Sequence, residues 1–241
     1  MRNFLTARWE NLVMANYEVD PAILIPYLPA GTELDHYQGK TYISLVGFLF
    51  VKTRIFGLPV PLMGTFEEVN LRFYVTRKEG TETKRGVVFI NETVPYKIVA
   101  WLANKLYKEH YTAIPTKRKW EIGLTRQIKY SWLINQQWNH LKVSALLQGE
   151  DMVAGSIEEF IFEHYWGYTR VSESVSEEYK VEHPRWTVYK VFSYEINCDF
   201  GQMYGAAFAH LSNTAPSSIM LAEGSDIAVK WKRRKIKPGN D

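Results

Sequence analysis

The stretch Phe66-Glu67-Glu68-Val69-Asn70-Leu71-Arg72-Phe73-Tyr74-Val75 alternates between polar and apolar side chains from residue 68 onward. Successive side chains of a β-strand point to opposite faces, so this stretch predicts a strand with one apolar and one polar face. The polar face carries Glu68, Asn70, Arg72 and Tyr74. The apolar face must be buried against another element, which predicts a β-sheet that is covered on at least one side.

The polar face of this strand has two interpretations. A carboxylate, an amide and a guanidinium two residues apart are neighbours and can hold a small polar ligand, with Arg72 binding a carboxylate and Glu68 acting as an acid or base. Alternatively, the polar face of an antiparallel strand faces solvent without any further role. The strand alone favours the second interpretation.

Outward from this strand, alternation of apolar and polar residues dominates the chain. Residues 94–111 are the exception, because Ile98, Leu102 and Leu106 recur every four residues with Thr93 as a candidate N-cap, which predicts one principal amphipathic helix. We therefore predict a mainly β protein with peripheral α-helices, built as a barrel or a sandwich. Strands are predicted at 9–19, 42–51, 66–76, 86–91, 128–134, 141–147, 152–163, 186–196 and 227–231.

Composition narrows the class of protein. The chain has 241 residues, a net charge of +3, one cysteine and 15% aromatic residues. Its length suits a single domain over residues 1–241, with a basic C-terminal tail at about 232–241. A lone cysteine excludes an internal disulfide and a cysteine-based zinc site, and no signal peptide or membrane-spanning stretch is visible. The expected location is the cytoplasm.

The common cofactor and nucleic-acid motifs are absent. The chain contains no dinucleotide-binding glycine pattern, no P-loop and no nucleophile elbow, and its six histidines lack the spacing of zinc ligands. We therefore expect no cofactor and no metal. The basic run at residues 230–237 could contact phosphate groups, but a final strand with a solvated tail explains it better, so nucleic acid is not an expected partner.

Several segments, taken in order, resemble the uncharacterised YqjF-like proteins, a group that is similar in fold to acetoacetate decarboxylase. The resemblance implies an antiparallel, cone-shaped β-barrel that encloses a pocket, with helices outside. The segments that carry it are Trp9-Glu10-Asn11-Leu12-Val13-Met14-Ala15-Asn16-Tyr17-Glu18-Val19-Asp20-Pro21, Leu28-Pro29-Ala30-Gly31, Gly39-Lys40-Thr41-Tyr42-Ile43-Ser44, Glu68-Val69-Asn70-Leu71-Arg72-Phe73-Tyr74-Val75, the helix through Ala103, His183-Pro184-Arg185-Trp186 and Leu221-Ala222-Glu223-Gly224.

The same resemblance bears on the chemistry. In acetoacetate decarboxylase a glutamate on the matching strand faces the active cavity, and Glu68 stands at that place. The decarboxylase's Schiff-base lysine lies in a segment that corresponds here to residues 103–112, where Tyr111 and Thr112 replace the lysine pair. Since a tyrosine cannot form an imine, acetoacetate decarboxylation by the usual route is not expected.

Two functional hypotheses follow. The first is an enzyme with lyase- or hydrolase-type chemistry on a small carboxylate or carbonyl compound, in which Glu68 is the acid or base, Arg72 anchors the carboxylate, and His110 and Tyr111 donate hydrogen bonds. The second is a non-catalytic protein that binds a small ligand in the same pocket. The expected ligand-binding residues are Asn70, Arg72, Tyr74, His110 and Tyr111. A raised pKa of Glu68 would favour catalysis, and an ion pair between Glu68 and Arg72 would favour binding or structure. The expected partner is a small molecule, with no membrane; a homo-oligomer is left open.

Overall fold

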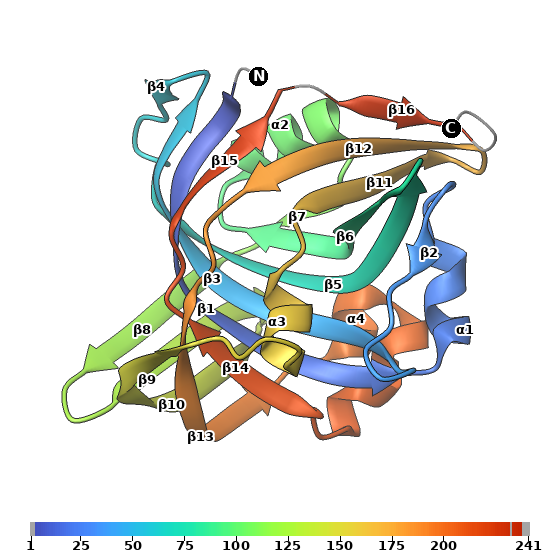
Figure 1. Cartoon of the computed structure of the whole chain (residues 1–241). Helices are drawn as coiled ribbons and strands as arrows, with labels where there is room; N and C mark the ends of the chain where they lie inside the picture. The colour runs from blue at the N-terminus through green and yellow to red at the C-terminus, as the bar shows by residue number, and fades with distance from the viewer. Residues whose placement is uncertain (1–2, 232, 238–241) are drawn as a thin grey trace.

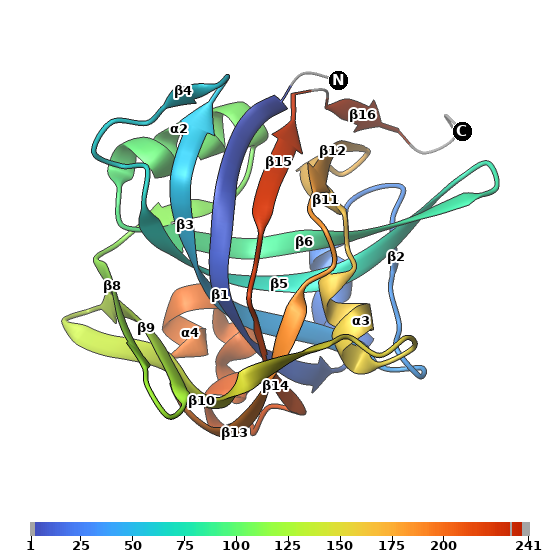
Figure 2. The ribbon, with the colours of Figure 1, turned by 60° about the vertical axis from the view of Figure 1, so that its left-hand side comes forward.

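A closed ring of seven β-strands forms the centre of the molecule (Figures 1 and 2). In the computed structural model, which describes residues 3–231 and 233–237, the pairing runs β1–β3–β5–β6–β11–β12–β15 and returns to β1. Neighbouring strands are antiparallel except where β6 meets β11, which are parallel. The prediction of a mainly β chain with peripheral helices is confirmed, and the ring closes as a barrel requires.

The elements have the following bounds. The strands are β1 (Asn3–Val19), β2 (Glu33–Leu34), β3 (Thr41–Ile55), β4 (Leu58–Pro59), β5 (Phe66–Glu79), β6 (Glu82–Val94), β7 (Tyr111–Ala113), β8 (Thr116–Ile122), β9 (Arg126–Ile134), β10 (Gln137–Asp151), β11 (Trp166–Ser172), β12 (Val175–Glu182), β13 (Thr187–Asn197), β14 (Ser218–Ala222), β15 (Asp226–Lys230) and β16 (Arg234–Ile236). The helices are α1 (Pro21–Leu24), η1 (Ile25–Tyr27), α2 (Lys97–Tyr107), α3 (Ile157–Phe162), α4 (Phe200–Tyr204) and η2 (Ala206–Asn213).

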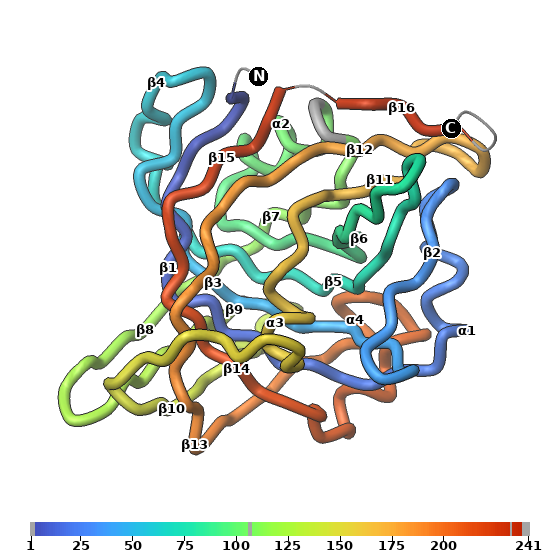
Figure 3. Tube along the Cα trace, in the orientation of Figure 1, coloured from blue at the N-terminus to red at the C-terminus, as the bar shows by residue number. Residues whose placement is uncertain are grey.

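A second layer of strands lies outside the ring. β14 pairs with β1, and the sheet continues through β13, β10, β9 and β8, which extend to the lower left in Figure 3. The apolar face of β5 packs into the core between this layer and the ring, where Leu71 and Phe73 meet Tyr130 and Trp132. The opposite, polar face of β5 therefore points into the ring.

The principal helix is shorter than the sequence predicts. Residues 94–111 were expected to be helical, but α2 spans only Lys97–Tyr107 and its N-cap is Tyr96 rather than Thr93. Thr93 and Val94 belong to β6, because they pair in register with Val69 of β5 and with the short strand β7. The helix ends at Lys108, which adopts a left-handed conformation with φ of 55°.

The strand predicted at 152–163 is wrong. Its second half is the helix α3, whose N-cap Ser156 accepts a hydrogen bond from the backbone N–H of Glu159. Gly149, which lies between the strands predicted at 141–147 and 152–163, belongs to β10 and stands opposite Tyr189. Phe160, Ile161 and Phe162 of α3 are buried.

The basic C-terminal segment is described in part. Residues 232 and 238–241 lie outside the described residues, while Arg234–Ile236 form β16 and pair with β12. Arg233 Nη1 lies 3.0 Å from Glu177 Oε2, and Arg234 pairs with Glu79. Of the helices within residues 3–231 and 233–237, none has the length and apolar character needed to cross a membrane.

Candidate functional site

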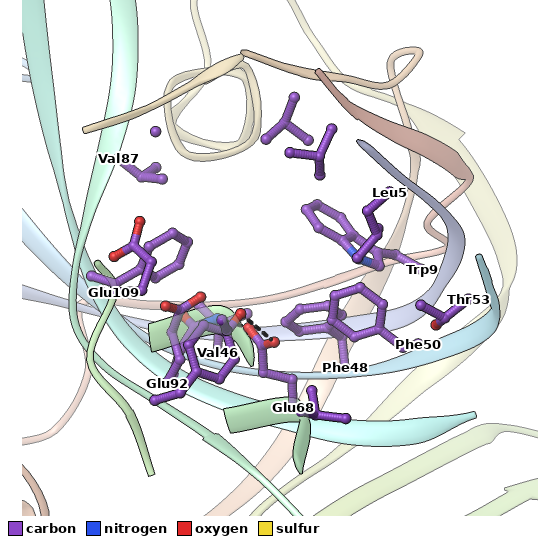
Figure 4. Close-up of a pocket in the computed structure, with 18 of the residues that line it drawn as sticks. Leu5, Trp9, Val46, Phe48, Phe50, Thr53, Glu68, Val87, Glu92 and Glu109 are labelled. Carbon is purple, nitrogen blue, oxygen red and sulfur yellow. Dashed lines mark hydrogen bonds between the residues drawn. The ribbon is translucent and has the colours of Figure 1, made fainter. Parts of the chain in front are cut away.

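A cavity of about 270 Å³ lies inside the ring (Figure 4). Inward side chains of β1, β3, β5 and β6 line it, and apolar residues of α2 close one end. Three of the four polar residues predicted on β5, Glu68, Asn70 and Arg72, contribute to this lining. The alternation in the sequence therefore separates a cavity face of β5 from a core face.

Strand register assembles the polar part of the lining. Asn70 of β5 stands opposite Val46 of β3 on one side and Glu92 of β6 on the other. Glu92 in turn stands opposite Tyr111 of β7. Directly opposed side chains on neighbouring strands lie about 5 Å apart at Cβ, so Asn70, Glu92 and Tyr111 form one row across the sheet.

Glu68 is held by two of these neighbours. Asn70 Nδ2 donates to Glu68 Oε1 at 3.0 Å, and the Tyr111 hydroxyl donates to Glu68 Oε2 at 3.2 Å. Only 3% of Glu68 is exposed. Burial raises the pKa of Glu68 to about 7, against the opposing effects of these two hydrogen bonds and of the Arg72 charge. The carboxyl group can therefore both give and take a proton near neutral pH.

Two further buried glutamates face the same cavity, and neither was among the predicted site residues. Glu92 is 3% exposed and Glu109 is 6% exposed. Burial, with the nearby carboxylates of Glu109 and Glu68, raises the pKa of Glu92 well above its usual range. Burial also raises the pKa of Glu109 to about 7, although Thr169 and Tyr179 donate hydrogen bonds to its Oε1 at 2.6 and 3.0 Å.

The position of these two carboxylates depends on long-range structure. Glu92 stands beside Asn70 because β6 pairs with β5. Glu109 is brought to the cavity by the turn that joins α2 to β7. Asn104 fixes the end of that turn, because its side-chain amide exchanges two hydrogen bonds with the backbone of Tyr111, at 2.9 and 2.7 Å. Sequence spacing carries no signal for either contact.

Arg72 is a buried cation without an acidic partner. It is 8% exposed, and its Nη2 contacts only the carbonyl oxygen of Ile161 and the sulfur of Met14, each at 3.5 Å. Within the described part of the chain it makes no ion pair, and its Nε has no hydrogen-bond partner. Five other atoms of the cavity residues are also buried without a partner: Trp9 Nε1, Thr53 Oγ1, Asn70 Oδ1, Glu92 Oε2 and His164 Nδ1.

Tyr111, Tyr74 and His110 take three different positions. Tyr111 lines the cavity, as described above. Tyr74 is buried but does not line it; its hydroxyl lies 2.6 Å from Ser44 Oγ, behind the cavity wall. His110 is exposed and meets this region only through its backbone carbonyl, which accepts hydrogen bonds from Glu92 N and Asn91 Nδ2. The side chain of His110 therefore differs from its expected place beside the cavity.

His164 is a further cavity residue that sequence reasoning did not select. It follows α3, and its Nε2 lies 3.1 Å from Asp35 Oδ2, while Arg85 Nε donates to the same oxygen at 2.8 Å. Burial lowers the pKa of His164 to about 4. Burial opposes ionisation of Asp35, but the hydrogen bonds from His164 and Arg85 outweigh it and hold the pKa of Asp35 below its ordinary value. A neutral His164 that donates from Nε2 leaves Nδ1 as an acceptor, and this atom has no partner.

The lining contains no lysine among the residues that the structure describes. Lys105 and Lys108, next to the segment that resembles the decarboxylase's lysine region, are exposed. In the same described residues, no group of three or more histidine, cysteine, aspartate or glutamate side chains is placed to hold a metal ion. The cavity thus presents carboxyl, guanidinium, phenol and imidazole groups.

Comparison with known proteins supports the resemblance seen in the sequence. Residues 6–226 match the DUF2071 family, described as "Uncharacterized conserved protein". The uncharacterised protein YqjF of Bacillus subtilis (strain 168) is 33% identical over 104 residues, which are 43% of this chain and 41% of that protein. The match thus spans less than half the length of this relative.

Solved structures share the fold at low identity. An acetoacetate decarboxylase-like enzyme from Sphingomonas wittichii RW1 has a TM-score of 0.66 at 10% identity, covering 98% of this chain and 94% of that one. Acetoacetate decarboxylase from Legionella pneumophila has a TM-score of 0.63 at 12% identity, covering 96% and 86%. The enduracididine biosynthesis enzyme MppR, complexed with pyruvate, has a TM-score of 0.64 at 10% identity, covering 98% and 91%. These similarities establish an acetoacetate decarboxylase-like fold.

Proposed function

The chain belongs to the DUF2071 family of uncharacterised conserved proteins, and from this premise we propose that its cavity binds and transforms a small carboxylate or carbonyl compound without a Schiff-base lysine. The proposal needs a group that recognises the ligand, a group that moves a proton, and a site shielded from water. The cavity residues supply all three.

The observation that carries the proposal is the unpaired Arg72. A buried guanidinium is stable only when an anion and hydrogen-bond acceptors compensate its lost hydration. Within the described residues Arg72 makes no ion pair, its charge acts on Glu68 only at longer range, and the cavity that it lines also holds the unpartnered Asn70 Oδ1 and Glu92 Oε2. A carboxylate is the ligand group that fits a guanidinium best, because it can accept two parallel hydrogen bonds.

Glu68 is our candidate for the proton-transfer step. A raised pKa favours a catalytic role, and two observations support one for Glu68: burial raises its pKa to about 7, and it is hydrogen-bonded to Asn70 and Tyr111 rather than to Arg72. The Tyr111 hydroxyl donates a hydrogen bond to the ionised form of Glu68, and it can donate instead to a carbonyl oxygen of the ligand. These roles suit lyase- or hydrolase-type chemistry on a small organic acid.

The structural neighbours support the class of ligand, not the reaction. MppR holds pyruvate, a 2-oxo carboxylate, within a related fold. Tyr111 occupies the segment that resembles the lysine region of acetoacetate decarboxylase, and the described lining has no lysine, so an imine mechanism has no amine to begin from. Fold similarity alone does not define an activity.

The alternative is a non-catalytic protein that binds a small ligand. The observation in its favour is that both oxygens of Glu68 already accept hydrogen bonds from the protein, which is also typical of a purely structural carboxyl group. The lone buried Cys198 agrees with a reducing compartment, and we propose that either function operates in the cytoplasm.

The first experiment compares the native and denatured masses of the purified protein by mass spectrometry. We expect a surplus mass in the native spectrum that corresponds to a retained carboxylate or carbonyl compound, and we expect it to disappear in the Glu68→Ala, Arg72→Ala double variant. The Lys119→Ala, Glu121→Ala double variant, which removes an exposed ion pair outside the cavity lining, is the matched control and should retain the ligand. No retained ligand, together with no thermal shift by any keto or hydroxy acid, would overturn the proposal.

A further inference from the structure

The cavity is divided into a carboxyl side and an aromatic side (Figure 4). Glu68, Glu92 and Glu109 lie together on one side, and Trp9, Phe48 and Phe50 lie on the other. We define the aromatic wall as the six aromatic cavity residues whose rings contact one another in a continuous series. Its members are Trp9, Phe48, Phe50, Phe66, Phe162 and Trp186.

The rings of this wall are closely packed. The Phe50 and Phe66 rings stack with centroids 4.8 Å apart, and the Trp9 ring meets Phe48 edge-on at 5.1 Å. Strand register explains the assembly, because Trp9 of β1 stands opposite Phe50 of β3, which stands opposite Phe66 of β5. The wall therefore starts on the same strand that carries the polar residues.

Position along β5 sets the distance between the two sides. Side chains on one face of a strand recur about every 6.8 Å, and Phe66, Glu68, Asn70 and Arg72 follow one another on the cavity face. Phe66 and Arg72 are six residues apart, which corresponds to about 20 Å along an extended strand. The other end of the wall lies near Arg72, because Phe162 follows Ile161, whose carbonyl oxygen contacts Arg72 Nη2. A tail of several carbons bound from Arg72 therefore meets Phe162 and Trp186 first.

The apolar lining continues from the wall to the end of the cavity at α2. Ile98 of α2 lines the cavity although 51% of the residue is exposed, and the partly buried Val60 and Met63 line it from the segment after β4. Figures 1 and 2 both show α2 and β4 at this end of the ring. A ligand that enters here meets apolar side chains before it reaches Arg72.

We propose that the ligand is an amphiphilic monocarboxylic acid, with its carboxylate at Arg72 and an aliphatic or aryl tail of several carbons against the aromatic wall. This inference rests on the proposed function, because it uses the same carboxylate contact, and it adds the class of substrate. The tail displaces water from the wall, and each buried methylene strengthens binding by the hydrophobic effect.

The test measures dissociation constants by isothermal titration calorimetry for straight-chain carboxylates from acetate to decanoate, for 3-phenylpropionate, and for the primary alcohols of the same lengths. We expect affinity for the acids to rise by about fourfold per methylene until the tail fills the wall. Equal affinity from acetate to decanoate would overturn the tail site while leaving the proposed function intact. Alcohols that bind as tightly as acids would overturn the carboxylate contact, and with it the proposed function.

Two substitutions of buried phenylalanines give a matched pair of variants. Phe162→Leu removes a ring from the aromatic wall at its end near Arg72, whereas Phe73→Leu makes the same change in the core outside the ring. We expect Phe162→Leu to weaken octanoate binding severalfold more than acetate binding, and Phe73→Leu to leave the ratio of the two affinities unchanged. An equal loss in both variants would overturn the tail site.

Because the chain-length series uses the unmodified protein, it decides the question even if a variant fails to fold. Absence of binding by every compound would overturn both proposals.

Discussion

The Tyr111 hydroxyl donates a hydrogen bond to Glu68 Oε2 over 3.2 Å, joining the turn after α2 to the cavity face of β5. The contact joins Glu68 and Tyr111, the two residues that the sequence resemblance relates to the cavity glutamate and the lysine segment of acetoacetate decarboxylase. At the second of these positions the chain carries a phenol, which donates a hydrogen bond but cannot form an imine. Because the phenol donates to the ionised form of the carboxyl group, it favours that form and restrains the rise in the pKa of Glu68.

Replacing Tyr111 by phenylalanine tests this contact directly. The Tyr111→Phe variant keeps the ring and loses only the donor, so we expect the titration midpoint of Glu68 to move to a higher pH than the value of about 7 in the unmodified protein. Carbon-13 NMR of labelled glutamate carboxyl groups measures this midpoint. Tyr165→Phe is the control, because Tyr165 donates to Glu163, which is not among the groups that act on Glu68, so that variant should leave the titration of Glu68 in place. An unchanged Glu68 midpoint in Tyr111→Phe would contradict the hydrogen bond.

The raised pKa of Glu68 predicts that the protein loses stability as the pH rises. The folded protein holds this proton up to about pH 7, whereas the unfolded chain releases it near the ordinary value of 4.5. The folded state therefore binds more protons between these values, and the free energy of unfolding falls across that window by about 3 kcal/mol for this group. Glu68→Gln, which cannot ionise, should match the unmodified protein below pH 4.5 and exceed its stability above pH 7.

Chemical denaturation at a series of pH values measures this difference. Glu121→Gln is the control, because Glu121 is exposed and its pKa is lowered by the Lys119 ammonium group, so this variant should retain the decline. If Glu68→Gln declined as steeply as the unmodified protein between pH 4.5 and 7, the pKa of Glu68 could not be the cause.

Two buried arginines on β5 should respond in opposite ways to the same substitution. Arg77 pairs with Glu178 at 3.5 Å, and both side chains are almost fully buried. Arg77→Met removes this cation but leaves Lys84 Nζ at 2.9 Å from Glu178, so it should destabilise the protein by about 1–3 kcal/mol. Arg72 makes no ion pair in the described residues and acts on Glu68 only at longer range, so Arg72→Met removes a weakly compensated buried charge and should leave stability equal or higher.

Thermal unfolding of the ligand-free protein measures both effects. A gain of about 1 kcal/mol would raise the melting temperature of a chain of this length by roughly 2–4 °C. The ligand should then stabilise the unmodified protein but not Arg72→Met. A large loss of stability in ligand-free Arg72→Met would mean that Arg72 is part of the scaffold, and would remove the main support for a carboxylate site.

Local patterns predicted one face of the site, and long-range pairing supplied the rest. The alternation at residues 68–75 predicted that Glu68, Asn70 and Arg72 share a face, because the period of a strand depends only on the local backbone. That this face lines a cavity follows from the closure of the ring, which no local pattern reports. Glu92 joins the site through strand register, so its role could not be predicted from its position in the sequence.

Some differences from the prediction had a signal in the sequence, and others had none. Ser156-Ile157-Glu158-Glu159 is a capping box, which indicates the start of α3 where a strand was predicted. The places of His110 and Tyr111 depend on where β7 begins, since neighbouring residues of a strand point in opposite directions. The resemblance predicted the right segment, but the side chain that faces the cavity is decided by the pairing of β7 with β6.

His164 predicts the opposite pH dependence from Glu68, on the acid side. The folded protein keeps His164 neutral down to about pH 4, whereas the unfolded chain takes up the proton near 6.5. The unfolded state therefore binds more protons between these values, and the free energy of unfolding falls by about 3 kcal/mol for this group as the pH is lowered from 6.5 to 4. His164→Gln should reduce this loss of stability between pH 6.5 and 4, because a glutamine amide can still donate to Asp35 but takes up no proton.

Denaturation curves between pH 4 and 7 measure how steeply the free energy of unfolding falls. His110→Gln, which changes an exposed histidine, should leave this dependence unaltered. If the free energy of unfolding of His164→Gln fell as steeply as that of the unmodified protein, protonation of His164 would not limit stability in this range. The His164 imidazole beside Asp35 would then not be held in its neutral form.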